Sequence, residues 1–183
     1  RSTLFPYTTL FRSTNFVKHF FKYESPLGPL IIESDGENLT KLSFDRGEHA
    51  LLREERDYTE ERDAVLEGTC NWLDTYFGGE APGFLPPIRL DGTSFQKDVW
   101  EILMEIPYGK TVTYGDIAKR IAKKREMKRM AAQAVGGAVG RNGIAIIVPC
   151  HRVIGSDGRL TGYAGGMDKK KWLLTLEKAE FLV

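Results

Sequence analysis

Cys150, His151 and Arg152 bring a thiol, an imidazole and a guanidinium together in consecutive positions. They follow Pro149 and a continuous apolar run over residues 144–148, which is typical of a buried strand. Positively charged neighbours favour the thiolate, and the thiolate is the nucleophilic form of cysteine. This segment therefore predicts a cysteine nucleophile at the end of a buried strand.

The second cysteine and the other histidines carry no sequence signal that would place them in the same site as Cys150. Cys70 falls inside a predicted helix, where a free cysteine is usually a packing residue. His19 and His49 lie outside any motif, and only Cys150 and His151 form a close pair, so a zinc site is poorly supported. A secreted disulfide-stabilised domain would carry more cysteines, so we expect a reducing, cytoplasmic setting.

The composition is that of an ordinary globular protein. Of the 183 residues, 42% are hydrophobic and 28% are charged, and no apolar run approaches the ~20 residues that span a bilayer. The net charge is −6 over residues 1–92 and +7 over residues 93–183. This asymmetry indicates either that the second half meets a polyanion or that two surfaces of opposite sign attract each other.

The N-terminal half predicts a small sheet domain over residues 14–90. Residues 1–13 fit no later pattern, and we interpret them as a non-native or disordered leader. Strand-like runs separated by turn signals lie between residues 20 and 44, and the apolar spacing over residues 63–77 predicts a helix. The strongly charged residues 45–62 are expected to be exposed.

A proline-rich linker over residues 80–92 predicts the boundary to a second, mostly helical domain over residues 91–183. Together the two halves predict an α/β (α+β) fold. The spacing of Thr93 and Gln96 and the Thr113–Asp116 segment predict two capped helix starts.

A further helix over residues 130–141 predicts, with the helix that starts near Thr113, a helix-turn-helix. Gly136 and Gly137 inside it cost about 1 kcal/mol each relative to alanine. Close approach of DNA or a tight contact with another helix would offset that cost.

Several motifs in one order resemble the O6-alkylguanine-DNA alkyltransferases, the methylated-DNA–protein-cysteine methyltransferase family. The resemblance covers about residues 20–180 and is closer in the second domain than in the first. The segments that carry it are Ser94-Phe95-Gln96, Pro107 to Lys110, Tyr114 to Ala118, Ala134 to Ala138, Val148 to Val153, Thr161 to Gly166, and Trp172-Leu173-Leu174 followed by Glu177.

The resemblance implies a role for each matching residue. Cys150 would accept the alkyl group, His151 would deprotonate it through a water, and Glu177 would orient His151. Tyr114 would donate a hydrogen bond to N3 of the base, and Asn142 would hold the active-site turn. The resemblance also implies a substrate-binding set and a DNA-binding set. The first comprises Val153, Ala164 and Lys170 beside Asn142, and the second comprises Ala132, Gln133, Gly136, Arg141 and Arg152. In the first set, the carbonyl of Val153 would accept from the exocyclic amine of guanine, and the Ala164 N–H and the Lys170 side chain would lie near O6 and the pocket wall.

The implied activity is a single-turnover transfer from double-stranded DNA containing O6-alkylguanine, with O4-alkylthymine left open. The resemblance implies no cofactor, no metal and no membrane, and we expect a monomer that binds mainly in the minor groove. Many family members carry an arginine where this chain has Gln133, and Gly143 replaces a frequent proline. Residues 123–128 lengthen the connection between the two helices.

Two other classes remain as alternatives. A non-catalytic protein that recognises alkylated DNA would keep the fold and lack the cysteine, whereas this chain has Cys150. A cysteine hydrolase would need an oxyanion hole and usually a distant histidine, and only His19 and His49 are distant in the sequence.

Overall fold

The computed structural model describes residues 17–55 and 57–183, and the expected leader over residues 1–13 lies outside them. A four-stranded sheet forms the N-terminal part, with the strand order β3-β2-β1-β4. The first three strands are antiparallel neighbours, and β4 pairs in parallel with β1. The strands are β1 (Lys18–Ser25), β2 (Gly28–Ser34), β3 (Leu39–Phe44) and β4 (Tyr58–Thr59).

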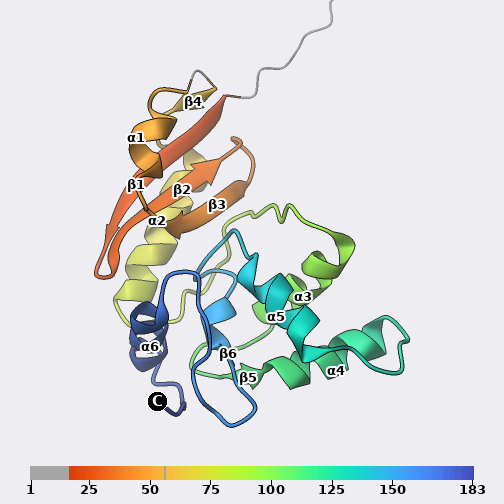
Figure 1. The fold of residues 1–183 in the computed structure, drawn as a ribbon. Helices are drawn as coiled ribbons and strands as arrows, with labels where there is room; N and C mark the ends of the chain where they lie inside the picture. The colour runs from red at the N-terminus through yellow and green to blue at the C-terminus, as the bar shows by residue number, and fades with distance from the viewer. Residues whose placement is uncertain (1–16, 56) are drawn as a thin grey trace, which may run out of the picture.

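Helix α2 (Ala64–Phe77) packs against this sheet (Figure 1). Its start is fixed by Asp63, whose side chain accepts a hydrogen bond of 2.8 Å from the backbone N–H of Leu66. The helix predicted over residues 63–77 is therefore confirmed, as are the strands between residues 20 and 44.

The described residues of the charged segment 45–62 are mostly exposed or half-buried, as predicted, but they also form regular structure that the sequence did not predict. The segment contains the short helix α1 (Glu48–Leu52) as well as β4. Leu52 is buried against Phe20 and Ile31, and these residues form a second, small apolar cluster. Because one buried leucine among many charges carries no periodicity, the sequence pattern missed this element.

The C-terminal part is mostly helical, as predicted. Both predicted capping boxes are present, at Thr93 with Gln96 and at Thr113 with Asp116. Helices α4 and α5 pack against each other in the expected helix-turn-helix order. The elements are α3 (Ser94–Met104), β5 (Val112–Thr113), α4 (Tyr114–Lys124), α5 (Ala132–Gly140), the 3-10 helix η1 (Cys150–Arg152), β6 (Val153–Ile154) and α6 (Met167–Leu176).

The prediction of a buried strand over residues 144–148 is wrong. The segment is a compact turn in which Ile146 has a φ of 69° and Val148 donates a backbone hydrogen bond of 3.1 Å to Ile144. The Asn142 side chain stabilises the turn by bonding the N–H and C=O of Ile144 and the C=O of Val148. An apolar run shows burial but does not distinguish a strand from a buried turn.

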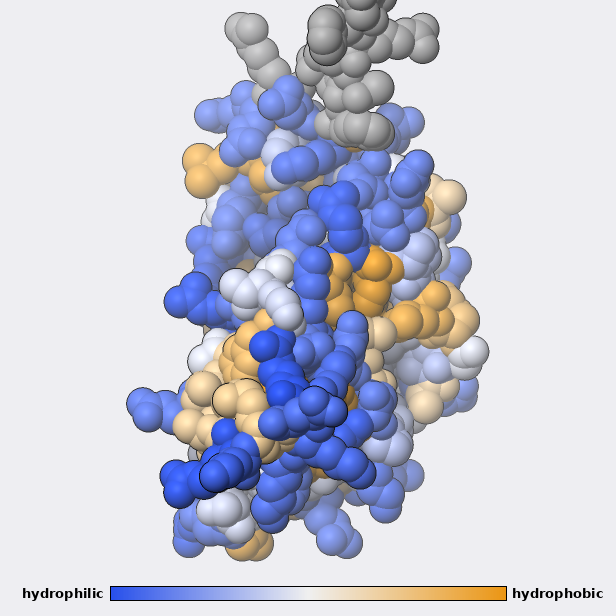
Figure 2. All heavy atoms as spheres, turned by 90° about the vertical axis from the view of Figure 1, so that its right-hand side faces the viewer, coloured by the Kyte–Doolittle hydropathy of each residue, from blue (hydrophilic) through white to orange (hydrophobic). Residues whose placement is uncertain are grey.

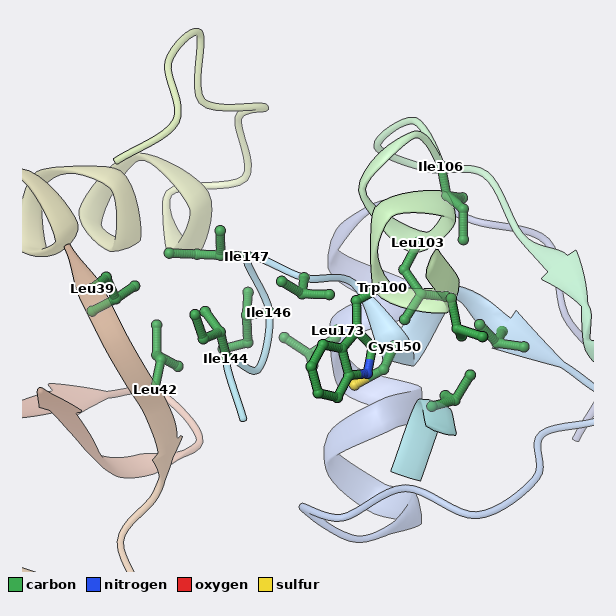
Figure 3. Packing of buried hydrophobic residues seen from close by; sticks show 14 of the residues in the cluster. Leu39, Leu42, Trp100, Leu103, Ile106, Ile144, Ile146, Ile147, Cys150 and Leu173 are labelled. Carbon is green, nitrogen blue, oxygen red and sulfur yellow. The ribbon is translucent and has the colours of Figure 1, made fainter. Parts of the chain in front are cut away.

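This turn joins the two parts of the molecule. Leu42 on β3 donates to the carbonyl of Gly143 at 3.0 Å and accepts from Ala145 at 2.8 Å. Figure 3 shows the isoleucine side chains of the turn between β3 and the side chains of the helical part. The linker also contacts β3, because Leu39 bonds the backbone of Pro87 and Arg89. One continuous apolar cluster therefore spans both parts.

The outer surface is mainly hydrophilic. Figure 2 shows this on the side that carries the α4–α5 connection, where apolar residues gather in a few patches. Phe84, Leu85 and Met127 are among the large apolar side chains that are exposed. None of the described helices is long and apolar enough to cross a membrane.

The two adjacent glycines of α5, Gly136 and Gly137, are not packed tightly against another helix. An added Cβ at Gly137 would meet no heavy atom within 4 Å, and one at Gly136 would make only an ordinary contact of 3.8 Å with the Tyr114 ring. A tight contact with another helix therefore does not explain Gly137.

We predict that Gly137→Ala raises the free energy of unfolding by about 1 kcal/mol, because it removes the helix penalty without a clash. Gly165→Ala is the matched control, because its added Cβ would lie 2.6 Å from the Phe44 ring and should destabilise the fold. Urea unfolding of both variants measures the effect. If Gly137→Ala were less stable than the parent, the conclusion that an added side chain at this position meets no other atom would be wrong.

Candidate functional site

Cys150 lines a cavity of about 910 Å³ that both parts of the chain build. Its walls include Tyr114 from the start of α4, Gln133 from α5 and the loop over residues 161–165. The N-terminal part closes one side with the end of β3 and the residues after it, Phe44 and Arg46 among them. A cavity of this size is in the range of small-molecule binding sites.

The thiol of Cys150 is held at the start of the 3-10 helix η1 and is 6% exposed. Asn142 Nδ2 lies 3.2 Å from its Sγ and donates toward it. Burial raises the pKa of Cys150, although the Asn142 hydrogen bond and the positive charge of Lys170 act to lower it. The resting residue is therefore a thiol at neutral pH, and reaction requires removal of its proton.

A buried carboxylate lies behind the thiol, at Glu177, the C-cap of α6. Its Oε1 is 2.7 Å from His151 Nε2 and 3.0 Å from Arg152 Nη2, and its Oε2 is 2.8 Å from Arg152 Nε. The backbone N–H of Gly109 donates to Oε2 at 3.1 Å, and the hydroxyl of Tyr76 donates to Oε1 at 2.6 Å. This network satisfies a charge that would otherwise be costly to bury.

The network fixes the protonation state of His151. Burial acts to raise the pKa of Glu177, but hydrogen bonds from His151 and Arg152 outweigh it and lower the pKa to about 2. Burial lowers the pKa of His151, against the opposing effect of Glu177. His151 is therefore neutral at pH 7, with its Nε2 proton directed to Glu177. Its Nδ1 has no hydrogen-bond partner among the described residues and is the nitrogen able to accept a proton.

Tyr114 and Lys170 were both predicted near the substrate, and they differ in position. Tyr114 lines the cavity, and its hydroxyl accepts a hydrogen bond of 3.1 Å from Thr161 Oγ1, which leaves its own proton to donate. Lys170 is fully buried, and its Nζ bonds the carbonyls of Val153 at 2.6 Å and Thr161 at 2.8 Å. Lys170 thus links the active-site turn to the loop over residues 161–165 and does not line the cavity. It donates to the Val153 carbonyl, which was expected to bind the base.

The end of β3 supports the cavity loop from the other domain. Phe44 packs edge-on against Tyr163 with ring centroids 6.4 Å apart, and no room is left for a side chain at Gly165. Arg46 hydrogen-bonds the carbonyl of Ala164, whose N–H was predicted near O6 of the base. The N-terminal part therefore shapes the site directly, which the sequence patterns did not indicate.

The predicted DNA-binding residues divide into two groups. Ala132, Gln133 and Gly136 line the mouth of the cavity on α5, and Arg141 is exposed at the end of that helix. Arg152 instead lies inside the protein, bonded to Glu177 and to the carbonyl of Ile106. Its guanidinium is already engaged there, so we correct its role from DNA contact to compensation of the buried carboxylate.

Tyr76 also reaches the site without any signal in the sequence that indicates it. Its ring belongs to the buried apolar face of α2, in agreement with the apolar spacing over residues 63–77. The partner of its hydroxyl, Glu177, is 101 positions away in the chain, and no spacing rule connects the two. No cluster of three or more His, Cys, Asp or Glu that could hold a metal occurs among the described residues.

Comparison with known proteins gives two family models that together cover most of the chain. Residues 19–90 match the ribonuclease-like domain of 6-O-methylguanine DNA methyltransferase, and residues 94–179 match its DNA binding domain. A methylated-DNA–protein-cysteine methyltransferase of Methanosarcina acetivorans is 46% identical over 155 residues, which is 85% of this chain and 95% of that protein. A protein of the same name from Haemophilus influenzae is 39% identical over 165 residues, 90% of this chain and 88% of that protein.

Solved structures agree with these matches. The crystal structure of Mycobacterium tuberculosis OGT in complex with DNA is 43% identical and superposes with a TM-score of 0.75, covering 87% of this chain and 92% of that one. The O6-methylguanine methyltransferase of the same organism gives a TM-score of 0.72 at 40% identity, covering 91% of this chain and 96% of that one. With both domain models matched in order and relatives of this identity over nearly the full length, the chain belongs to the 6-O-methylguanine DNA methyltransferase family.

Proposed function

We propose that this chain repairs DNA by moving an alkyl group from O6 of a damaged guanine onto Cys150, once per protein molecule. The observation that carries the proposal is the position of the Cys150 thiol in a large cavity, with the His151–Glu177 pair directly behind it. The names of the relatives support the same activity, since they are methylated-DNA–protein-cysteine methyltransferases.

The substrate would be double-stranded DNA from which the damaged nucleotide is rotated into the cavity. O6 of guanine is inaccessible to a buried thiol while the base is stacked, and extrusion costs a few kcal/mol. The exposed small residues of α5 and its Gln133 border the cavity mouth, which suits close approach of a duplex along that helix. The basic C-terminal half predicts clear salt dependence of binding. The family resemblance implies that the protein binds mainly in the minor groove.

The chemistry is a displacement at the alkyl carbon. His151 takes the proton of Cys150 through a water, and the sulfur forms a bond to the carbon as the bond between that carbon and O6 breaks. The guanine leaves with the electron pair of that bond. A hydrogen bond from Tyr114 to N3 and one from the Ala164 N–H to O6 would stabilise the charge that develops on the base.

The product explains the single turnover. The transfer leaves a thioether on Cys150, and water does not cleave a thioether. The same chemistry needs a free thiol at the start, which favours the reducing, cytoplasmic setting expected from the sequence. Neither a metal nor a cofactor is required for any step.

The proposal is tested by intact-protein mass after incubation with an oligonucleotide duplex containing O6-methylguanine. The wild type should gain one methylene unit and saturate at one per molecule, while Cys150→Ala should gain none and Cys70→Ala should behave as wild type. Tight binding without a mass gain would instead support the non-catalytic recognition protein. Turnover of an ester or amide would support the hydrolase.

We predict that Asn142→Ala slows alkylation of Cys150 by iodoacetamide about tenfold at neutral pH. Its side chain donates to the sulfur, so its loss raises the pKa of Cys150 further and lowers the reactive thiolate fraction. The measurement is the alkylation rate from pH 7 to 10 in a Cys70→Ser background. Circular dichroism checks that the turn is retained, and an unchanged rate profile would show that Asn142 does not stabilise the thiolate.

Substitution of Gln133 tests how the protein opens the DNA duplex. Gln133→Arg should speed transfer from duplex DNA by about tenfold, because a longer, charged side chain can fill the gap left by the rotated base. Transfer from the free base O6-benzylguanine should not change. Ala134→Arg adds the same charge to an exposed position of α5 that does not line the cavity. Equal acceleration by both variants would assign the effect to charge alone.

A further inference from the structure

The hydroxyl of Tyr76 enters the catalytic network from the other domain. Tyr76 is carried by α2 and is fully buried, and its hydroxyl donates to Glu177 Oε1 at 2.6 Å. The same hydroxyl lies 3.4 Å from His151 Nε2. We propose that Tyr76 is a positioning residue for alkyl transfer, through which the N-terminal domain holds the carboxylate that orients the base. This inference rests on the proposed function.

The ring of Tyr76 is explained by packing alone, whereas the hydroxyl is not. The ring stacks on Trp72 at 5.3 Å and meets Phe77, Tyr108 and His151 edge-on. A phenylalanine would fill the same space without a polar atom to satisfy. A buried hydroxyl is costly unless it is hydrogen-bonded, so its presence here points to a specific use.

The role of the Tyr76 hydroxyl follows from the carboxylate oxygen to which it donates. Glu177 Oε1 accepts from the Tyr76 hydroxyl, His151 Nε2 and Arg152 Nη2, so Tyr76 and His151 share one acceptor. Tyr76 therefore restrains the rotation of the carboxylate and draws away part of the negative charge that would bind the His151 proton. Burial and the neighbouring carboxylate raise the pKa of Tyr76, so the hydroxyl stays protonated and remains a donor.

Loss of this hydroxyl should therefore change His151 in a definite direction. With Tyr76 gone as a donor, Oε1 binds the His151 proton more strongly and raises the pKa of His151. The other charged groups that act on His151 stay in place: Glu177 itself, Arg152 beside it and Lys170 from α6. The neighbouring Cys150 is an uncharged thiol at rest. The form of the protein with neutral His151 would then be reached only at higher pH, and the carboxylate would be less well fixed.

The experiment compares Tyr76→Phe with Tyr23→Phe. Tyr23 lies on β1, in the same N-terminal domain as Tyr76, and donates to a carboxylate of α2, Asp74 Oδ1, at the same 2.6 Å. Neither Tyr23 nor Asp74 lines the cavity. Single-turnover rates are measured between pH 5 and 9 with an O6-methylguanine duplex and with free O6-benzylguanine, and melting temperatures are recorded for each protein. The end-point mass gain counts the active molecules.

We expect Tyr76→Phe to transfer about tenfold more slowly on both substrates, because the carboxylate that orients His151 is no longer held in place. The acid side of its rate profile should move to higher pH, because the pKa of His151 rises. Tyr23→Phe should keep the wild-type rate and profile. The double variant Tyr76→Phe/Glu177→Gln should be no slower than Glu177→Gln alone, because Tyr76 acts through that carboxylate.

Three results would overturn the inference. Tyr76→Phe could lower the melting temperature and keep the wild-type rate and pH profile, which would make the hydroxyl purely structural. Tyr23→Phe could be equally slow, which would indicate general loosening of the N-terminal domain. The double variant could be slower than Glu177→Gln by the full effect of Tyr76→Phe. Absence of any mass gain in the wild type would instead refute the proposed function itself.

Discussion

The requirement to compensate one buried carboxylate organises this molecule. Glu177 has no exposed side-chain surface, and a charge in that position is tolerated only when several donors surround it. Arg152 and His151 from η1, Gly109 after α3 and Tyr76 from α2 all bond it. Segments far apart in the chain must therefore meet at one point, which fixes how α6 sits against both domains (Figure 1). The same donors hold the carboxylate ionised and so prepare it to orient the base.

The turn before Cys150 meets a second constraint, because it must expose a sulfur at a cavity wall while the preceding apolar side chains stay in the core. A straight strand would alternate its side chains between two faces. The left-handed residue Ile146 instead directs the chain back on itself, and Asn142 stabilises this turn by accepting from the N–H of Ile144 and donating to its C=O. Asn142 also reaches the sulfur, so the residue that stabilises the turn adjusts the reactivity of Cys150.

Local sequence signals predicted the structural features that depend on residues close together along the chain. The capping boxes located α3 and α4, and the matched motifs located Cys150 together with His151. The strand predicted over residues 144–148 failed because burial was visible and the side-chain bonds of Asn142 were not. The pairing of Tyr76 with Glu177 and the interior position of Arg152 could not be predicted, because each depends on long-range packing that no period or spacing records.

The resting chemistry of the site suits a protein that can react only once. A permanently ionised thiolate would be open to oxidation and to unrelated alkylating agents, and each such event would consume a molecule. Burial instead raises the pKa of Cys150 and lowers that of His151, so a thiol faces a neutral base and neither carries charge. Proton transfer between them then becomes useful only when an electrophilic carbon occupies the cavity. The fixed carboxylate behind His151 makes that transfer favourable at the moment of reaction, since it stabilises the imidazolium as it forms.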